Sequence, residues 1–85
     1  MTTTQINVIL CSILETLDET PGGSPESILY LAAQQHVPDV DWGQIVYVLT
    51  SSRLVTSENH RMKIADRGRG IAKMSRDFRA KAVRA

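Results

Sequence analysis

Apolar residues recur every three or four positions in the first part of the chain, a spacing that places them on one face of an α-helix. We therefore predict an amphipathic helix over residues 4–18, capped by the hydroxyl of Thr3 or Thr4. The helix must end near Glu19, because residues 20–23 (Thr-Pro-Gly-Gly) combine a helix-breaking proline with two glycines. The apolar stripe consists of Ile6, Ile9, Leu10, Ile13, Leu14 and Leu17.

A second helix is predicted over residues 25–35. Ser24 is expected to cap it, and Pro25 to occupy its first turn, where the missing amide hydrogen costs nothing. The helix ends before Pro38, since the residue that precedes a proline is pushed out of helical geometry. Its pattern places four apolar side chains in or near the core: Ile28, Leu29, Leu31 and Ala32.

A third helix is predicted over residues 40–52, with Asp39 or Asp41 as its cap. At about 100° per residue, one face of this helix is apolar and the opposite face carries hydrogen-bonding groups but no charge. The apolar face consists of Trp42, Ile45, Val46 and Leu49, and the outer face of Gln44, Tyr47, Val48 and Ser51.

After Ser52 the period of the pattern changes from helical to alternating. Residues 54–57 and 61–64 are predicted to form two short strands, joined by a turn in which Asn59 is the best-suited residue. Alternation in the second strand turns Met62 and Ile64 to one side of the hairpin, and Arg61 and Lys63 to the other.

The helical period returns from Asp66 onward, with an apolar stripe of Ile71, Met74 and Phe78. Gly68 and Gly70 weaken the first turns of this helix by up to ~1 kcal/mol each relative to alanine. We therefore expect that tertiary packing needs their small size. The chain divides into one domain over residues 1–75 and a basic helical end over residues 76–85 that is free to fray.

The composition is that of an ordinary globular domain. A chain of 85 residues with 42% apolar and 22% charged content supports one modest core. Cys11 is the only cysteine, which excludes an intramolecular disulfide and favours a cytoplasmic location. No apolar run approaches the ~18 residues that cross a bilayer, and the first residues lack the features of a signal peptide. We expect no membrane association.

Charge is distributed very unevenly along the chain. Residues 1–50 carry six acidic residues and no base, whereas residues 51–85 carry all ten lysines and arginines and three acidic residues. The overall charge of +1 therefore hides a negative and a positive half. A half this basic can hold a polyanion such as nucleic acid if folding gathers it on one surface. The acidic half must then face elsewhere or serve another purpose.

The sequence contains no catalytic or metal-binding pattern. No nucleophile, base and orienting group stand together, so we expect no enzymatic activity. Cys11, His36 and His60 lack metal-ligand spacing, which predicts no metal site. Gly68-Arg69-Gly70 has neither the preceding strand nor the ending of a phosphate loop, so no cofactor is expected.

The most specific segment is Leu49-Thr-Ser-Ser-Arg-Leu-Val, followed by the hairpin and by Ile64-Ala-Asp-Arg-Gly-Arg-Gly-Ile-Ala72. With the order of helices and hairpin, it resembles a winged helix-turn-helix domain of the small bacterial, archaeal and phage transcriptional regulators, over residues 5–74. In that pattern a recognition helix ends in Leu-x-x-x-Gly-Leu-Ile and the wing closes with Leu-Thr-x-x-Gly-x-x-x-Ala.

Gly68 and Ala72 match the resemblance, and two residues depart from it. Arg53 stands where the pattern has a glycine, at a position that often demands positive φ. Ala65 replaces the threonine that caps the last helix, which leaves Asp66 as a substitute cap.

The resemblance implies a mainly α fold with a small β-hairpin, in the α+β class, with a three-helix core, a two-stranded wing and a C-terminal helix. It implies a DNA-binding transcriptional regulator whose helix over residues 40–52 enters the major groove of double-stranded DNA, with a basic wing on the backbone or minor groove. The chain would act as a homodimer through its first or last helix, with Val8 and Cys11 in the contact. The implied DNA-binding residues are Gln44, Tyr47, Ser51, Arg53, His60, Arg61, Lys63, Arg67 and Arg69.

The alternative hypothesis is a protein interaction module without DNA binding, either an adaptor or a phage-type inhibitor of a host protein. The outer face of the third helix carries no base before Arg53, and Asp39 and Asp41 would repel phosphates at its start. Tyr47 and Val48 would then form the interface with the protein partner. DNA binding requires that the cationic half lie beside the outer face of this helix.

Overall fold

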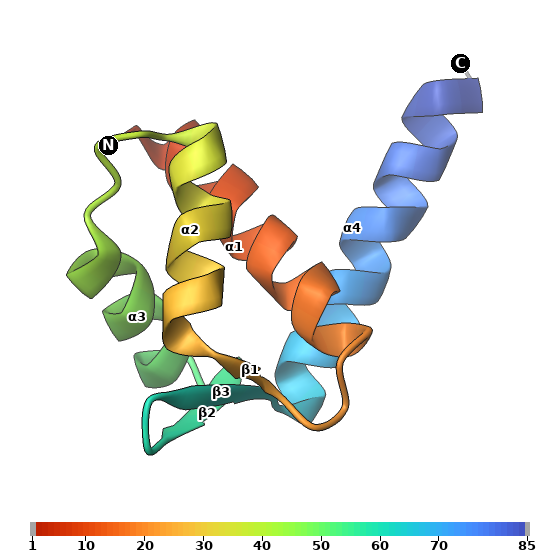
Figure 1. Ribbon diagram of the computed structural model, residues 1–85. Helices are drawn as coiled ribbons and strands as arrows, with labels where there is room; N and C mark the ends of the chain where they lie inside the picture. Colours follow the sequence, from red (N-terminus) through yellow and green to blue (C-terminus); the bar gives the residue numbers. More distant parts are fainter. Residues whose placement is uncertain (1, 85) are drawn as a thin grey trace.

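The computed structural model describes residues 2–84 and contains four helices and a three-stranded antiparallel sheet, which confirms a mainly α fold of the α+β class. Helices α1, α2 and α3 pack together above the sheet, and α4 runs past the end of α1 and stands away from the other helices at its C-terminal end (Figure 1). In chain order the elements are α1 (Thr3–Asp18), β1 (Ser24–Pro25), α2 (Glu26–His36), α3 (Trp42–Ser51), β2 (Val55–Glu58), β3 (Arg61–Ile64) and α4 (Asp66–Arg84).

Helix α1 begins slightly earlier than its apolar stripe indicated. Its cap is Thr2, and the assignment to Thr3 or Thr4 was wrong. The Thr2 hydroxyl accepts a hydrogen bond from the amide of Gln5 at 3.1 Å, and the Gln5 side chain accepts one from the amide of Thr2 at 2.9 Å. This reciprocal pair satisfies two amides at the helix end, which explains why Thr2 outcompetes its neighbours.

Strand β1 is the main departure from the predicted fold. Ser24 pairs with Met62 and Pro25 with Arg61 of β3. Pro25 stands at the N-cap position of α2 and not in its first turn, and Ser24 does not cap the helix. The amide of Glu26 donates to the carbonyl of His60 at 2.8 Å, so the hairpin provides the acceptor that a side-chain cap would have supplied. Long-range pairing with β3 therefore decides the conformation of this segment.

Gly23 allows the chain to enter β1 close to β3. Its φ of 84° lies in the left-handed region that favours glycine. A Cβ atom at this position would lie 2.6 Å from the carbonyl oxygen of Met62. Gly23 thus admits the additional strand.

The core lies between the three bundled helices and the inner face of the sheet. Helix α2 contributes only Leu29 and Ala33, whereas Ile28 is 55% exposed and Leu31 62% exposed. Their predicted place in the core was wrong, because α2 packs on α1 along a narrow face of residues four apart. The buried apolar residues are Ile9, Ile13, Leu14, Leu17, Leu29, Ala33, Val37, Val40, Ile45, Leu49, Leu54, Val55, Met62 and Ala72.

The hairpin has the predicted alternation, with β2 displaced by one residue. Met62 is buried and Ile64 packs against the core, while Arg61 and Lys63 are exposed. Asn59 and His60 form the two-residue turn with φ values of 51° and 60°, the positive angles that match the twist of a hairpin. Arg53, between α3 and β2, also has a positive φ of 58°.

Helix α4 packs its first turns tightly against the rest of the molecule. A Cβ atom on Gly68 would clash with the backbone carbonyl of Leu54, and Ala72 is fully buried. Gly70 has open space around it, so the expected packing requirement was wrong at that position. Asp66 is the first helical residue and not a cap beyond the helix end. The helix continues through residues 76–84, where fraying was expected.

Candidate functional site

The outer face of α3 is exposed, and the charged groups of this region lie at its two ends. Asp41 caps the helix by accepting a hydrogen bond from the amide of Gln44 at 3.2 Å. Ile45 and Leu49 are buried, which turns Gln44 and Tyr47 outward, and Tyr47 is 70% exposed. The side-chain amide of Gln44 and the phenol of Tyr47 can both form hydrogen bonds with a partner.

Ser51, also predicted at this interface, lies on the same exposed face. Its hydroxyl donates to the carbonyl of Tyr47 at 2.6 Å. The side chain is therefore already satisfied within the helix, although its oxygen can still accept a hydrogen bond from outside.

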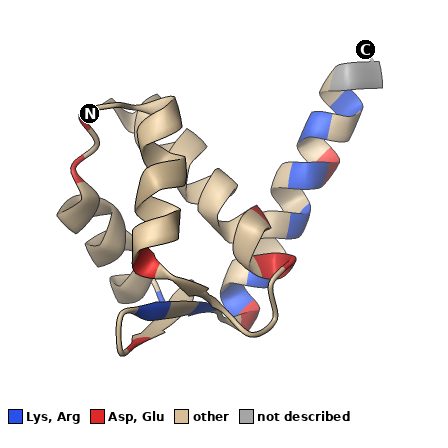
Figure 2. Ribbon diagram, viewed as in Figure 1, with Lys and Arg blue, Asp and Glu red and all other residues tan. Residues whose placement is uncertain are grey.

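Three exposed cations follow α3 along the chain. Arg53 follows the helix, Lys63 lies on the outer side of β3, and Arg67 lies in the first turn of α4. Among residues 2–84, the structure shows no ion pair and no side-chain hydrogen bond for any of these three residues. The basic positions of β3 and of the first turns of α4 lie along the lower edge of Figure 2, the edge to which α3 also descends.

Of the other three basic residues of the predicted set, Arg61 is held by the fold, whereas Arg69 and His60 are exposed. The guanidinium of Arg61 donates to the carbonyls of Gly22 at 3.1 Å and Gly23 at 3.4 Å, and so holds the loop that leads into β1. Arg69 pairs with Asp66 at 3.6 Å on the exposed surface, a contact that contributes little in water. His60 is exposed at the hairpin turn.

The second half of α4 uses its arginines against α1. The Nη1 atom of Arg76 lies 2.6 Å from the carboxylate of Asp18, and its Nη2 atom donates to the backbone carbonyl of Glu15 at 3.1 Å. Arg79 pairs with the carboxylate of Glu15, to which the Ser75 hydroxyl also donates at 3.0 Å. We call this set of contacts the α1–α4 seam. The hydrogen bond to Asp18, with the nearby negative charges, raises the pKa of Arg76.

The α1–α4 seam shows that part of the acidic half serves another purpose, which is to pair with basic residues of α4. Acidic residues of α1 neutralise part of the basic charge inside the molecule. In sequence, the acidic residues on one side of α1 and the polar and basic residues on one side of α4 are both spaced by three or four positions. That shared period was the signal that sequence reasoning missed. The cations of this half of α4 consequently lie away from α3 (Figure 1).

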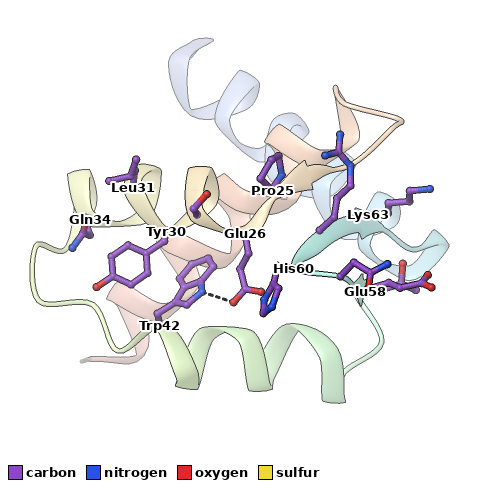
Figure 3. Close-up of a pocket in the computed structure, with 13 residues that line it drawn as sticks. Pro25, Glu26, Tyr30, Leu31, Gln34, Trp42, Glu58, His60 and Lys63 are labelled. Atoms are coloured by element: carbon purple, nitrogen blue, oxygen red, sulfur yellow. Dashed lines mark hydrogen bonds between the residues drawn. The ribbon is translucent and has the colours of Figure 1, made fainter.

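A groove of about 1040 Å³ lies beside α3, between α2, the start of α3 and the outer face of the hairpin (Figure 3). The Nε1 atom of Trp42 donates to a carboxylate oxygen of Glu26 at 2.8 Å. The ring of Tyr30 meets that of Trp42 edge-on, with the ring centroids 5.4 Å apart. Trp42 thus packs against the core, as predicted from its helical face, and also forms part of the groove wall.

The hairpin completes the groove with residues of both charges. Glu58 and His60 line it, and the side chain of Lys63 extends away from Trp42 (Figure 3). Arg61 also lines the groove, but its guanidinium is held by the loop before β1. The carboxylate of Glu26 lies beside the Trp42 ring, and Glu58 lines the hairpin side of the same groove, so the groove is suited to a positively charged group. This groove depends on contacts between distant segments, so the sequence carried no signal for it.

The described residues contain neither a metal-ligand cluster nor a helix that is both long and apolar enough to cross a membrane. Comparison of the chain with protein-family models, curated proteins and solved structures gives no match. Function is therefore inferred from the geometry of this chain alone.

Proposed function

We propose that the chain is a small DNA-binding protein that places the outer face of α3 in the major groove. The observation that supports this most is the exposed, uncharged outer face of α3, which is followed directly by the exposed Arg53, with the basic positions of β3 and of the first turns of α4 along the same lower edge of the molecule (Figure 2). Base edges in the major groove present distinguishable patterns of donors and acceptors. The side-chain amide of Gln44 would contact a base, for which adenine is the best bidentate partner, and Tyr47 would contact a base or phosphate.

The phosphate contacts of this proposal come from a narrower set than the sequence indicated. Arg53, Lys63 and Arg67 would hold the backbone, with His60 at the hairpin turn reaching a phosphate or the minor groove. Arg61 would act by positioning the hairpin through its contacts with Gly22 and Gly23. Ser51 and Arg69 would add contacts at the margins of this surface.

The element order supports the resemblance to a winged helix-turn-helix regulator. Three helices, a hairpin and a closing helix follow one another, and the positive φ of Arg53 agrees with the glycine position of that pattern. The tight packing at Gly68 and Ala72 agrees with the two small residues that close the wing. The hairpin would then serve as the wing, and the protein would act in the cytoplasm by occupying a promoter.

Fluorescence anisotropy with a labelled random duplex across a series of salt concentrations tests the proposal. Three phosphate contacts predict that log K falls with log salt with a slope of about −3. Lys63→Ala should reduce the magnitude of that slope by about one. Lys81→Ala is the matched control, because Lys81 is also exposed but lies on the second half of α4, and it should leave the slope unchanged. Absence of binding at low salt, or equal effects of the two variants, would reject the proposal.

The groove favours a second candidate, a protein interaction module that docks a basic segment of another protein. The observation that favours it is that Glu26, which is hydrogen-bonded to Trp42, and Glu58 of the hairpin line the same groove as Tyr30 and Trp42. Trp42 is the only tryptophan, so its fluorescence reports on the groove directly. Nuclease-resistant capture of one stoichiometric partner, lost in Glu58→Gln and retained in Lys63→Ala, would favour this candidate over DNA binding.

A further inference from the structure

The groove between α2, the start of α3 and the hairpin has the size and lining of a small-molecule site. Its volume of about 1040 Å³ is at the upper end of the range of ~300–1000 Å³ that is usual for such sites. Its wall combines apolar side chains, among them Pro25, Tyr30, Leu31 and Trp42, with a few polar groups. This lining suits a ligand that has an apolar body and one polar group.

The carboxylate of Glu26 is the polar group that the fold holds in place. Its Oε1 atom accepts the hydrogen bond from Nε1 of Trp42 at 2.8 Å, and the Trp42 ring in turn meets Tyr30 edge-on (Figure 3). Glu26 is half-buried in the first turn of α2, where the helix dipole favours the ionised carboxylate. A carboxylate can accept about four hydrogen bonds, so Glu26 can still receive a donor from a ligand.

The negative charge of Glu26 has no cation beside it. Among residues 2–84 the structure shows no ion pair for this carboxylate. The two strong cations of the groove wall are directed elsewhere, since Arg61 is held by the loop before β1 and Lys63 extends away from Trp42 (Figure 3). Solvent screens a half-buried charge only in part, and aromatic rings attract cations. This end of the groove therefore favours a positively charged ligand group.

We propose that the groove binds a small organic ammonium ion. The charged nitrogen would lie against the Glu26 carboxylate and the Trp42 ring, and the apolar body of the ligand would lie along Tyr30 and Leu31. The ammonium N–H groups would donate to the carboxylate, a charge-assisted hydrogen bond. This ligand site goes beyond the proposed DNA binding and does not depend on it.

The hairpin side of the groove limits the ligand to a single positive charge. Arg61 and Lys63 line that side, and Glu58 offsets only one of their two charges. A ligand with several cations would meet repulsion there, whereas a single ammonium group at Glu26 would not. A protein segment with one lysine also satisfies this condition, so the experiment compares such a segment with a free ammonium ion.

Titration of the full chain with phenethylammonium at constant ionic strength, without DNA, tests the site. Trp42 is the only tryptophan, so its fluorescence should change and saturate as the ligand binds. The neutral compound of the same shape, 2-phenylethanol, should bind at least about tenfold more weakly, because it forms no charge-assisted bond with Glu26. Equal affinities for the two compounds, or no saturable change with millimolar phenethylammonium, would overturn the proposal.

Substitution of Glu26 tests which group holds the cation. Glu26→Gln keeps an oxygen that can accept from Nε1 of Trp42 but removes the charge, so it should weaken phenethylammonium binding by at least about tenfold. Asp77→Asn is the matched control, because it removes one negative charge from an exposed position of α4 outside the groove, and it should leave the affinity unchanged. Circular dichroism checks that both variants are folded. Equal effects would mean that net charge, and not the groove, attracts the ligand.

A short capped peptide with a single lysine separates a free ligand from a docked protein segment. We expect it to bind no more tightly than phenethylammonium, and tighter binding of the peptide would refute the small-ligand site in favour of protein docking. The indole N–H signal of Trp42 in NMR spectra should move with either compound, which locates the contact in the groove. Because DNA is absent from every titration, failure of the DNA-binding proposal would leave these results unchanged.

Discussion

The basic residues between α3 and the first turn of α4 and those in the second half of α4 come from the same stretch of sequence but have different surroundings. Arg53, Lys63 and Arg67 have no acidic partner among the contacts that the structure shows, whereas Arg76 and Arg79 are held by the acidic side of α1. The first group is available to a polyanion, and the second contributes to internal structure. Charge density along a sequence therefore overstates the charge that a fold presents to a partner.

The largest effect on stability is expected from a substitution in the first turn of α4. Gly68→Ala places a methyl group against the carbonyl of Leu54, so the start of α4 must shift, and we expect a loss of about 3 kcal/mol in the free energy of unfolding. Gly70→Ala is the matched control, because nothing lies near Gly70 and alanine favours the helix by up to about 1 kcal/mol. Urea denaturation of the two variants measures the contrast. Equal stability changes would show that the two glycines are equivalent.

The next largest effect is expected on DNA affinity, which should differ between variants of the two groups of cations. Replacing Arg53, Lys63 and Arg67 together by alanine should lower affinity for a duplex on the order of a hundredfold at low salt. Replacing Arg76 and Arg79 by alanine should lower thermal stability and change affinity much less, because these side chains already bind α1. Anisotropy titrations at a temperature where both variants are folded measure this difference. The reverse ranking would place the DNA surface on α4.

A smaller effect is expected inside the α1–α4 seam. Arg76→Gln and Asp18→Asn should each lower the melting temperature, and the double variant should lower it by less than the sum, because the two side chains share one contact of 2.6 Å. Added salt should weaken this coupling, since the pair remains partly accessible to solvent. Additive effects would mean that the pair contributes nothing specific.

The smallest effect is expected for the exposed pair at the start of α4. Arg69→Ala removes a contact of 3.6 Å with Asp66, which is fully exposed, so stability should change by less than about 0.5 kcal/mol. Chemical denaturation is sufficient to set this limit. A loss comparable to that of Arg76→Gln would mean that exposure does not separate the two kinds of ion pair.

The hydrophobic periodicity predicted those elements whose conformation depends on residues close to them in the sequence. The stripe of α1, the two faces of α3 and the alternation of β3 all follow from local spacing. Strand β1 could not be predicted in this way, because two residues are too few to show a periodic pattern. They form a strand only because β3 provides the pairing. For the same reason Ser24 was mistaken for a cap.

Only part of the candidate DNA-binding site could be predicted from the sequence. Outward placement of Gln44 and Tyr47 follows from the helical period, but the bonds of Arg61 to residues 22 and 23 depend on folding. The α1–α4 seam joins residues about 60 positions apart, and the groove beside Trp42 joins three elements. The periods of α1 and α4 show which residues share a face but not that these two faces meet, and the groove has no local sequence signature. The sequence therefore could not say which cations would be neutralised.

A chemical-shift titration of the isotopically labelled chain with a random DNA duplex tests the central claim most directly. The account predicts that the amide or side-chain signals of Gln44, Tyr47, Arg53, Lys63 and Arg67 move on addition of DNA, while those of Arg76 and Arg79 stay in place. Shifts confined to the second half of α4, or no shifts at low salt, would contradict it.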